Sequence, residues 1–426
     1  MKKPSIVILG AGLGGAVAAF EIQQTVGPGA DVTVVSQGET FHFVPSNPWV
    51  AVGWRTRDAI SVALPPILAK KGLAFTPVGA RRVHPVENRV ELNDGTSLAY
   101  DYLVIATGPD LAFDEVEGLG PKAGFTQSIC HVDHAEMAAA AFEALVKSPG
   151  PIVVGAAQGA SCFGPAYEFA MILDTELRRR KLRDRVPMTF VTPEPYIGHL
   201  GLDGVGDTKG MLESELRDRD IKWITNARIL KADAGVLDVE EVAEDGSVRA
   251  RRELPFAFSM VLPAFRGVEA VRGIDGLTNP RGFVLVDKTQ RNPTFPNIFA
   301  LGVCVAIPPI GKTPVPVGVP KTGFMIESMV TAVAENLRAL IGGEPAVAEA
   351  TWNAICLADF GDGGVAFIAQ PQIPPRNLNW SAEGRWVHLA KVGFEKYFLR
   401  KIRHGESAPF YERLALDLMG QKKLKA

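Results

Sequence analysis

The sequence predicts an α/β protein with two tandem Rossmann-like domains, followed by a C-terminal region of amphipathic helices. Three observations lead to this fold. The 426 residues are enough for two or three domains, and the 43 glycines favour many tight turns between strands and helices. Two segments, beginning near Ser5 and Pro151, each predict a strand, a glycine-containing turn and a helix. The stretch 376–426 combines aromatic and basic side chains at helical spacing.

The order of these segments predicts the domains. Residues 1–113 and 282–350 form a discontinuous first domain, residues 114–281 form a second domain inserted into it, and residues 351–426 form the C-terminal region. The net charge of −2 gives no reason to expect a nucleic-acid partner. Residues 376–426, however, hold eleven Lys and Arg against five Asp and Glu, which indicates an anionic surface as the partner of this end of the chain.

The first strand and turn lie in SIVILGAGLGGAVAAFEIQ (5–23). Gly10 permits a tight turn, Gly12 lets the backbone approach a pyrophosphate, and Gly15 lets the helix pack on the strand. The lysines and apolar run at the start of the chain resemble a secretion signal, but cleavage there would remove the turn, so we expect a strand. No apolar run reaches the roughly 18 residues that span a bilayer.

Three later turns extend this nucleotide site. Ser36, after the strand DVTVV, stands where an acid usually holds the ribose hydroxyls. YDYLVIATGP, with Thr107 and Gly108, and NPTFPNIFALGVC, with Gly302, resemble the two later fingerprints of FAD-binding reductases with paired Rossmann domains of the FAD/NAD(P) type. Those reductases usually carry an Asp after the last glycine, where this chain has Val303. The resemblance implies FAD in the first domain.

The second strand and turn, VVGAAQGASCFGPAYE (153–168), depart from the nucleotide-binding pattern. Ala157 stands where a second glycine would let the backbone approach a pyrophosphate, and Cys162 and Phe163 crowd the start of the helix. We therefore expect this domain to lack a working NAD(P)H site.

Seven long motifs point to one family. They are FVPSNPWVAVGW, SICHVDHAE, GASCFGPAYE, EPYIGHLG, TPVPVGVPKTGFMIE, TWNAICLADFGD and GRWVHLAKVGFEKYF. Together they resemble sulfide:quinone oxidoreductase nearly from end to end. The resemblance implies a membrane-surface flavoenzyme that oxidises hydrogen sulfide to polysulfide or sulfur and passes electrons through FAD to a membrane quinone, either ubiquinone or menaquinone.

The same resemblance implies where the protein resides and what it meets. We expect a peripheral, monotopic protein at the inner (cytoplasmic) membrane of a bacterium. The sequence does not predict on which side of that membrane it lies. Its expected partners are hydrogen sulfide, quinone, the lipid bilayer surface and further copies of the chain in a homo-oligomer. No nucleic acid is expected.

The four cysteines are too few and too widely spaced for a secreted disulfide scaffold or a zinc site, so no metal is expected. By resemblance, Cys162 and Cys356 form a redox pair. HS⁻ attacks the oxidised pair, one cysteine becomes a persulfide and the other a thiolate, and two electrons pass to the flavin. Cys356 is expected next to the flavin, and Cys162 is expected to carry the growing sulfur chain. Cys130 matches a family cysteine for which two roles stay open, assistance in sulfur entry or attachment of the flavin. Cys304 is expected to be buried and inert.

The family motifs also supply candidate bases. His134, His199 and Glu168 are candidates for deprotonating H₂S and persulfides, because His titrates near neutral pH and burial raises the pKa of a carboxyl group. The alternative for each His is a core position with its hydrogen bonds satisfied.

Further residues are expected at the cofactor. The N–H groups of Thr322 and Gly323, at the start of a predicted helix, and the charge of Lys321 suit the N1/O2 edge of reduced flavin. The alternative is a helix end that docks in the core. Pro45 is expected at the cofactor as well.

Residues 385–405 predict an amphipathic helix, and 408–420 a second short one. The apolar face is Trp386, Leu389, Ala390, Gly393, Phe394, Tyr397 and Phe398. Charge is expected elsewhere, on Lys391, Glu395, Lys396, Arg400, Lys401 and Arg403. Such helices lie in a membrane interface, which predicts a membrane-docking region; the alternative is packing on the protein itself or on a partner copy. By resemblance, Phe394 and Tyr411 sandwich the quinone ring, and Lys391 polarises a quinone carbonyl.

Three alternatives stay open at this level. The flavin subunit of a flavocytochrome sulfide dehydrogenase shares the cysteine pair, but it would carry a cleavable signal and no amphipathic tail. A type II NADH:quinone reductase shares the architecture and the tail, but it needs an intact second glycine loop and no cysteine pair. A membrane-docked redox sensor or scaffold would bind FAD and turn over neither substrate.

Overall fold

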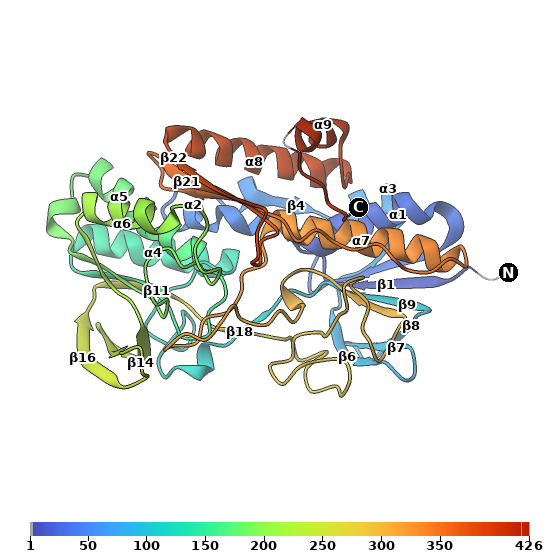
Figure 1. Cartoon of the computed structure of the whole chain (residues 1–426), viewed down its shortest axis with the longest axis horizontal. Coiled ribbons are helices and arrows are strands. Elements are labelled where there is room, and N and C mark those ends of the chain that lie inside the picture. The colour runs from blue at the N-terminus through green and yellow to red at the C-terminus, as the bar shows by residue number, and fades with distance from the viewer. Residues whose placement is uncertain (1–2, 419, 426) are drawn as a thin grey trace.

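The computed structural model describes residues 3–418 and 420–425 and has the predicted mixed α/β fold, with two parallel sheets of Rossmann type (Figure 1). The first sheet has the order β19-β9-β1-β2-β5, with every neighbouring pair parallel. Its strands are β1 (Ser5–Leu9), β2 (Asp31–Val35), β5 (Ala74–Thr76), β9 (Tyr102–Ile105) and β19 (Ile298–Ala300). Most of their β-branched and leucine side chains are buried, as is usual for a parallel sheet. β19 joins this sheet from almost two hundred residues further along the chain.

The second parallel sheet has the order β13-β12-β11-β17. Its strands are β11 (Ile152–Ala156), β12 (Met188–Val191), β13 (Ile221–Ile224) and β17 (Phe258–Leu262). An antiparallel sheet lies beside it, composed of β14 (Ala227–Asp233), β15 (Val236–Val242) and β16 (Val248–Pro255). The two sheets lie at the left of Figure 1, at the opposite end of the molecule from β1 and β9.

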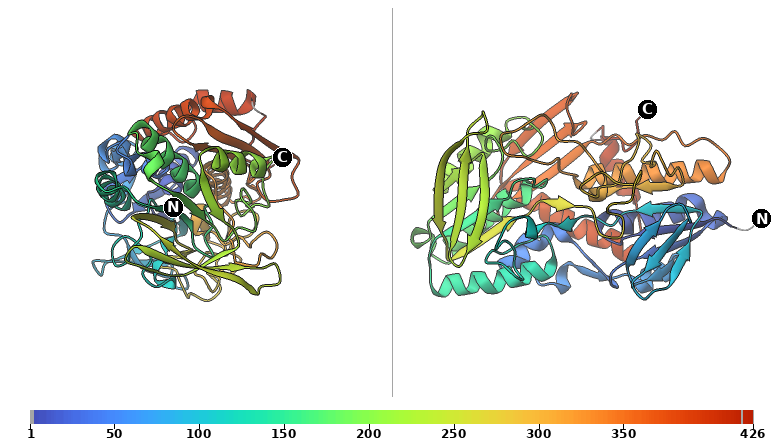
Figure 2. Two further views of the ribbon diagram at one scale, coloured as in Figure 1. Left: turned by 90° about the vertical axis from the view of Figure 1, so that its left-hand side faces the viewer. Right: turned by 90° about the horizontal axis from the view of Figure 1, so that it is seen from below.

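A third, antiparallel sheet carries the C-terminal cysteine. It consists of β20 (Ala354–Asp359), β21 (Gly364–Gln370) and β22 (Leu378–Glu383). The helices α8 (Arg385–His404) and α9 (Phe410–Leu418) follow, and α8 packs on β20 and β21. Figure 1 shows both helices along the upper edge of the molecule, and Figure 2 shows the same layer from two further sides.

The remaining helices cover the sheets and connect them. They are α1 (Leu13–Val26), α2 (Asn47–Ala51), α3 (Pro65–Lys70), α4 (Val132–Lys147), α5 (Gly164–Arg179), α6 (Thr208–Asp218) and α7 (Gly323–Ile341). The remaining strands are β3 (Thr40–His42), β4 (Ser61–Ala63), β6 (Ala80–His84), β7 (Arg89–Leu92), β8 (Ser97–Ala99), β10 (Asp110–Leu111) and β18 (Phe265–Arg266). The long helix α7 packs along α1, and α5 packs on both β11 and β20. Among the described residues, no helix is both long and apolar enough to cross a membrane.

Candidate active site

The first glycine turn forms a cradle at the start of α1. Gly10 has a φ of +102°, and a Cβ there would lie 2.4 Å from the carbonyl oxygen of Ala106. A Cβ on Gly15 would lie 2.0 Å from the carbonyl oxygen of Gly10, so both positions require glycine. A Cβ on Gly12 would meet no atom within 4 Å. The space above the N-terminus of α1 therefore fits the pyrophosphate of a dinucleotide.

The other turns predicted to hold the cofactor lie at the same edge of the sheet. Ser36 follows β2, Thr107 and Gly108 follow β9, and Gly302 follows β19. Since these strands are parallel neighbours of β1, their carboxyl ends meet at the edge where a Rossmann domain binds its ligand. Gly302 has a φ of +79°, and a Cβ there would lie 3.7 Å from the Cγ2 atom of Ile326, in the first turn of α7.

The N-terminus of α7 has the features that the sequence predicts for a flavin edge. Thr322 is the N-cap in extended conformation, and a Cβ on Gly323 would meet no atom within 4 Å. No acidic side chain occupies the first turn, so the positive end of the helix dipole is uncompensated there. Burial lowers the pKa of the adjacent Lys321 to about 8. These residues fit an anionic ring edge. Pro45 lies in the 3₁₀ turn Val44–Ser46.

Three cysteines from separate segments gather at one place. All four cysteines are free, and Cys304 is fully buried, as predicted, with its thiol donating to the carbonyl oxygen of Ile105 at 3.3 Å. Burial raises the pKa of Cys162 to about 12, and the nearby Cys130, Cys356 and Glu168 raise it further. Burial likewise raises the pKa of Cys130 and Cys356 to about 11. At neutral pH these thiols are therefore protonated, and a base is needed to form a thiolate.

The predicted bases differ in their strength. Burial, aided by His131, lowers the pKa of His134 to about 4, and its Nδ1 is buried without a hydrogen-bond partner among the described residues. Burial also lowers the pKa of His199, whose Nδ1 accepts a hydrogen bond from the N–H of Gly201 at 3.2 Å. Both imidazoles are neutral at pH 7 and are weak proton acceptors there. Glu168, by contrast, has its pKa raised by burial to about 7.

Glu168 on α5 forms a buried ion pair with Lys391 on α8. The ammonium donates to both carboxylate oxygens, at 3.0 and 3.1 Å, and to the carbonyl oxygen of Leu357 at 3.2 Å. Leu357 follows Cys356 on β20, so the pair lies directly beside the cysteine strand. Burial outweighs the pairing for Glu168. For Lys391 burial is also the largest single effect, but the attraction and hydrogen bonding of Glu168, together with the nearby Cys356 and Asp359, raise the pKa. In this structure Lys391 is therefore bound to Glu168. The predicted hydrogen bond from Lys391 to a quinone carbonyl would require this ion pair to break.

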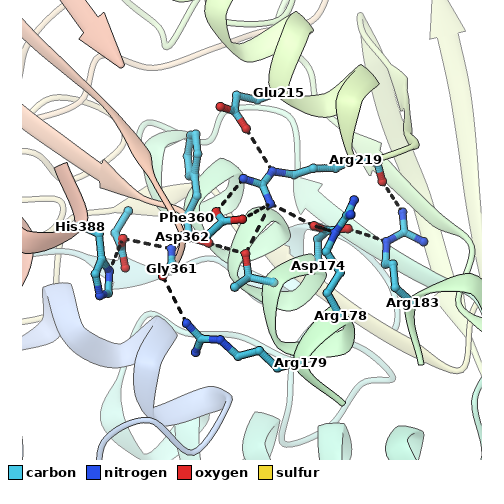
Figure 3. Close-up of polar contacts among 12 residues, drawn as sticks. Asp174, Arg178, Arg179, Arg183, Glu215, Arg219, Phe360, Gly361, Asp362 and His388 are labelled. Atoms are coloured by element: carbon cyan, nitrogen blue, oxygen red, sulfur yellow. Dashed lines mark hydrogen bonds and ion pairs between the residues drawn. The ribbon is translucent and has the colours of Figure 1, made fainter. Parts of the chain in front are cut away.

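The turn after the cysteine strand is anchored to the second domain (Figure 3). Arg219, the C-cap of α6, donates to Asp362 at 2.7 Å and to the buried Asp174 of α5 at 3.0 Å. The Thr175 hydroxyl donates to the carbonyl oxygen of Phe360 at 2.7 Å. Because these contacts fix the end of β20, they also fix the position of Cys356 three residues before it.

The second glycine turn is covered by the chain itself. The N–H of Gly159 donates to the carbonyl oxygen of Pro316 at 2.7 Å, and the N–H of Gly318 donates to the carbonyl oxygen of Ala160 at 2.8 Å. A Cβ on Gly318 would lie 2.6 Å from the Cβ of Ser161, so this segment lies directly on the turn. Phe163 is fully buried below it. We call residues 316–318 the strap.

Comparisons with known proteins agree on one family. A family model described as pyridine nucleotide-disulphide oxidoreductase matches residues 4–335. The sulfide-quinone reductase of Aquifex aeolicus (strain VF5) is 41% identical over 415 residues, which cover 97% of this chain and 94% of that relative. The chain belongs to the sulfide:quinone oxidoreductase family. This membership implies a flavin cofactor, for which the cradle and the α7 N-terminus described above are suited.

Solved structures extend the likeness to the whole fold. The X-ray structure of the sulfide:quinone oxidoreductase from Aquifex aeolicus matches with a TM-score of 0.93 and covers 99% of this chain and 96% of the other. The NDH2 structure from Plasmodium falciparum in complex with NADH matches with a TM-score of 0.72, covers all of both chains and is 16% identical. The second likeness shows a shared fold alone.

Within this family member, the predicted quinone residues lie in a cluster of aromatic rings. The ring of Phe394 lies 5.7 Å from that of Phe43 and 6.1 Å from that of Tyr397. Tyr397 in turn lies 6.0 Å from Tyr411 on α9, between ring centroids. The Tyr411 hydroxyl is buried and has no hydrogen-bond partner among the described residues. The structure therefore brings Phe394 and Tyr411 to the same aromatic cluster through Tyr397.

The helix α8 does not divide cleanly into an apolar face and an exposed charged face. Lys391, Glu395 and Lys401 are buried, whereas Leu389, on the predicted apolar face, is 70% exposed. Each buried charge has a partner on another element: Glu395 accepts from Ser46 and Arg55, and Lys401 contacts Glu327 and Glu412. Helical periodicity identifies apolar faces, but it does not distinguish a buried, paired charge from an exposed one.

Sequence reasoning also missed His388 and Asp359. His388 Nδ1 lies 2.8 Å from an oxygen of Asp359, which is fully buried at the end of β20. The available signals were an acid three residues after the cysteine and a histidine one helical turn before Lys391. Neither signal indicates an Asp359–His388 pair unless β20 and α8 are known to pack together.

Proposed function

We propose that this chain oxidises hydrogen sulfide and reduces a membrane quinone, with FAD as its flavin. The observation that carries this proposal is the gathering of Cys130, Cys162 and Cys356 beside Glu168, with Lys321 close enough to Cys162 to lower its pKa. Bound FAD supplies the two-electron chemistry that links sulfide to quinone. The name of the Aquifex aeolicus relative, sulfide-quinone reductase, includes both substrates.

The cysteine pair and Glu168 account for the sulfide half of this reaction. HS⁻ bonds to one sulfur of an oxidised Cys162–Cys356 pair, the bond between the two sulfurs breaks, and a persulfide and a thiolate result. Sulfide loses two electrons overall, and its protons must leave through a base. Glu168 has a suitable pKa of about 7 and lies within electrostatic range of Cys162 and Cys356. Cys130, His134 and His199 are proposed to assist at the same site, and polysulfide or sulfur is the proposed product.

The strap supports sulfide rather than NAD(P)H as the electron source. Its hydrogen bonds use the N–H of Gly159 and the carbonyl oxygen of Ala160, in the turn that would face a pyrophosphate. Ala157, which replaces a glycine of the usual pattern, is also buried. The second domain, proposed as residues 114–281, thus acts as a scaffold for Cys162.

The C-terminal region supports a membrane quinone as the acceptor. Its described residues expose the large apolar side chains of Leu378, Trp380, Trp386, Leu389, Phe410, Leu414 and Leu418. These residues belong to β22, α8 and α9, which lie along the upper edge of the molecule in Figure 1. Phe410, Leu414 and Leu418 repeat every four residues, so they share one face of α9. We propose that this face lies on the lipid surface of a bacterial inner membrane and that quinone enters beside Phe394 and Tyr411.

Sulfide-dependent reduction of decylubiquinone tests this function. Cys356→Ser is expected to lower the rate at least a thousandfold, because the attacked sulfur pair is lost. Cys304→Ala serves as the matched control, because the buried Cys304 thiol bonds to the backbone carbonyl oxygens of Ile105 and Leu301, and its loss should leave the rate within about threefold. Equal rates in the Cys356→Ser variant and the wild type would contradict the proposal.

A further inference from the structure

The inner face of α8 carries ionisable side chains at intervals of about one turn. His388, Lys391 and Glu395 follow one another at spacings of three and four residues, so they lie along one side of the helix. Each contacts a different element of the protein: Asp359 of β20, Glu168 of α5, and Ser46 with Arg55 near α2. The side chain of His388 is 30% exposed to solvent, whereas Lys391 and Glu395 are buried.

His388 and Asp359 form a hydrogen-bonded pair that connects water with the interior. Asp359 is fully buried and accepts hydrogen bonds from Trp49 Nε1 at 2.8 Å and from the N–H of Gly361 at 3.0 Å. An ionised Asp359 can only accept, so the imidazole of His388 then carries a proton on Nδ1. The His388 side chain is 30% exposed and Asp359 is fully buried, so water reaches the pair from the His388 side. Figure 3 shows His388 at the end of the network that holds the turn after β20.

The second pair, Glu168 and Lys391, lies within reach of the first. The charge of Asp359 raises the pKa of both Glu168 and Lys391, and its backbone N–H lowers that of Glu168 by hydrogen bonding. The other titratable groups that face Glu168 are the thiols of Cys162 and Cys356. His388 and Lys391 lie one turn apart on α8, while Asp359 and Leu357 lie two residues apart on β20, so the two pairs are adjacent on both elements.

We propose that the His388–Asp359 pair is the water-side entry of a proton path that ends at the Glu168–Lys391 pair and serves quinone reduction. The proposal rests on the proposed function. Quinone takes up two electrons and two protons to become quinol, and the electrons come from sulfide through the flavin. The lipid side supplies no protons, and each HS⁻ that is oxidised releases only one, so at least one of the two must come from water through side chains of the protein. A proton binds at Nε2 of His388, the Nδ1 proton passes to Asp359, and the Glu168–Lys391 pair is reprotonated in turn.

Two substitutions at the entry separate proton transfer from structure. His388→Gln retains a side-chain N–H that can donate to Asp359 but cannot carry a proton, whereas His388→Ala removes both functions. After anaerobic reduction by sulfide, both variants are expected to be reoxidised by decylubiquinone at least about tenfold more slowly than the wild type at pH 7. Ferricyanide accepts electrons without protons, so its rate should be unchanged. Free imidazole should restore the quinone rate of His388→Ala.

A third variant is the matched control for these measurements. His404 is exposed at the other end of α8, and His404→Ala should behave as the wild type with both acceptors. A normal quinone rate in His388→Gln, or equal slowing with quinone and ferricyanide, would overturn the proposal. If the wild type itself is not reduced by sulfide or reoxidised by quinone, the failure lies in the proposed function and not in the proton path.

A readout without turnover tests the coupling between the two pairs. The carboxyl stretching band of Glu168, assigned by its loss in Glu168→Gln, can be titrated by infrared spectroscopy. Because the charge of Asp359 raises the pKa of Glu168, Asp359→Asn should lower that pKa. An unchanged titration would show that the two pairs are independent and would contradict a continuous path.

Discussion

Glu168 shows how burial changes what one residue does at neutral pH. An exposed glutamate is ionised at pH 7, but the desolvated Glu168 has a pKa of about 7 even with Lys391 beside it. It can therefore both release and accept a proton next to Cys356. The sequence predicted this upward shift from a helix position after Cys162, but it assigned Lys391 to quinone, because a salt bridge across 223 residues has no local signal.

The shift of Glu168 makes a prediction for the pH dependence of stability. A carboxyl group whose folded pKa is raised stabilises the fold below its unfolded pKa, near 4.5, and this contribution is lost as the pH rises through about 7. Thermal unfolding midpoints measured from pH 4.5 to pH 8 should therefore fall less steeply with pH in Glu168→Gln than in the wild type.

The surface variant Glu87→Gln is the control for this measurement. Glu87 is exposed and pairs with Arg89 at the surface, so its substitution should leave the slope of the wild type unchanged. Parallel curves for Glu168→Gln and the wild type would show that Glu168 is ionised in the folded protein throughout this range.

At the scale of elements, a cluster of four largely buried charges joins the C-terminal helices to the body. Lys401 of α8 and Lys423 each contact both Glu327 of α7 and Glu412 of α9, at 2.9 to 3.1 Å. Burial alone raises the pKa of Glu327, but Lys401 and Lys423 lower it to about 2. Lys401 is fully buried. The amphipathic helices were predictable from their spacing, but these contacts were not, because they join charges that the pattern assigns to the surface.

Removal of one cation from this cluster should loosen α9. In Lys401→Met, Glu327 and Glu412 retain only Lys423, and an uncompensated buried charge typically costs about 3 to 5 kcal/mol. Hydrogen exchange in residues 410–418 should rise markedly. Lys396→Met, at an exposed position of the same helix, should leave that exchange unchanged. Equal exchange in both variants would show that the charge cluster does not hold α9 in place.

The exposed apolar face of these helices makes a second prediction at this scale. The double variant Leu389→Glu/Phe410→Glu places two negative charges on the proposed lipid face, where both side chains are at least 70% exposed. Cosedimentation with liposomes containing anionic lipid should fall at least tenfold, because apolar contact is lost and anionic headgroups repel the new charges. Glutamate at the exposed Val86 and Val347, outside this face, should leave binding unchanged. Undiminished binding of the first variant would place the lipid contact elsewhere.

At the scale of the whole molecule, distant segments converge on one site. The two Rossmann-like sheets were predictable because each begins with a strand, a glycine turn and a helix, and the glycine requirements of the first turn follow from close backbone contacts. The convergence of Cys130, Cys162 and Cys356 was not deducible from spacing and came from family resemblance. The strap over the second turn had no sequence signal beyond Ala157, because it depends on how residues 316–318 cross from the first domain.

The most direct test of the central claim is anaerobic stopped-flow absorbance of the purified yellow protein. We expect sulfide to bleach the flavin band within about a second, decylubiquinone to restore it, and NADH to leave it nearly unchanged, because the cysteine cluster accepts sulfide and the strap covers the second nucleotide turn. Rapid bleaching by NADH without bleaching by sulfide would contradict the account and would assign the protein to NADH oxidation.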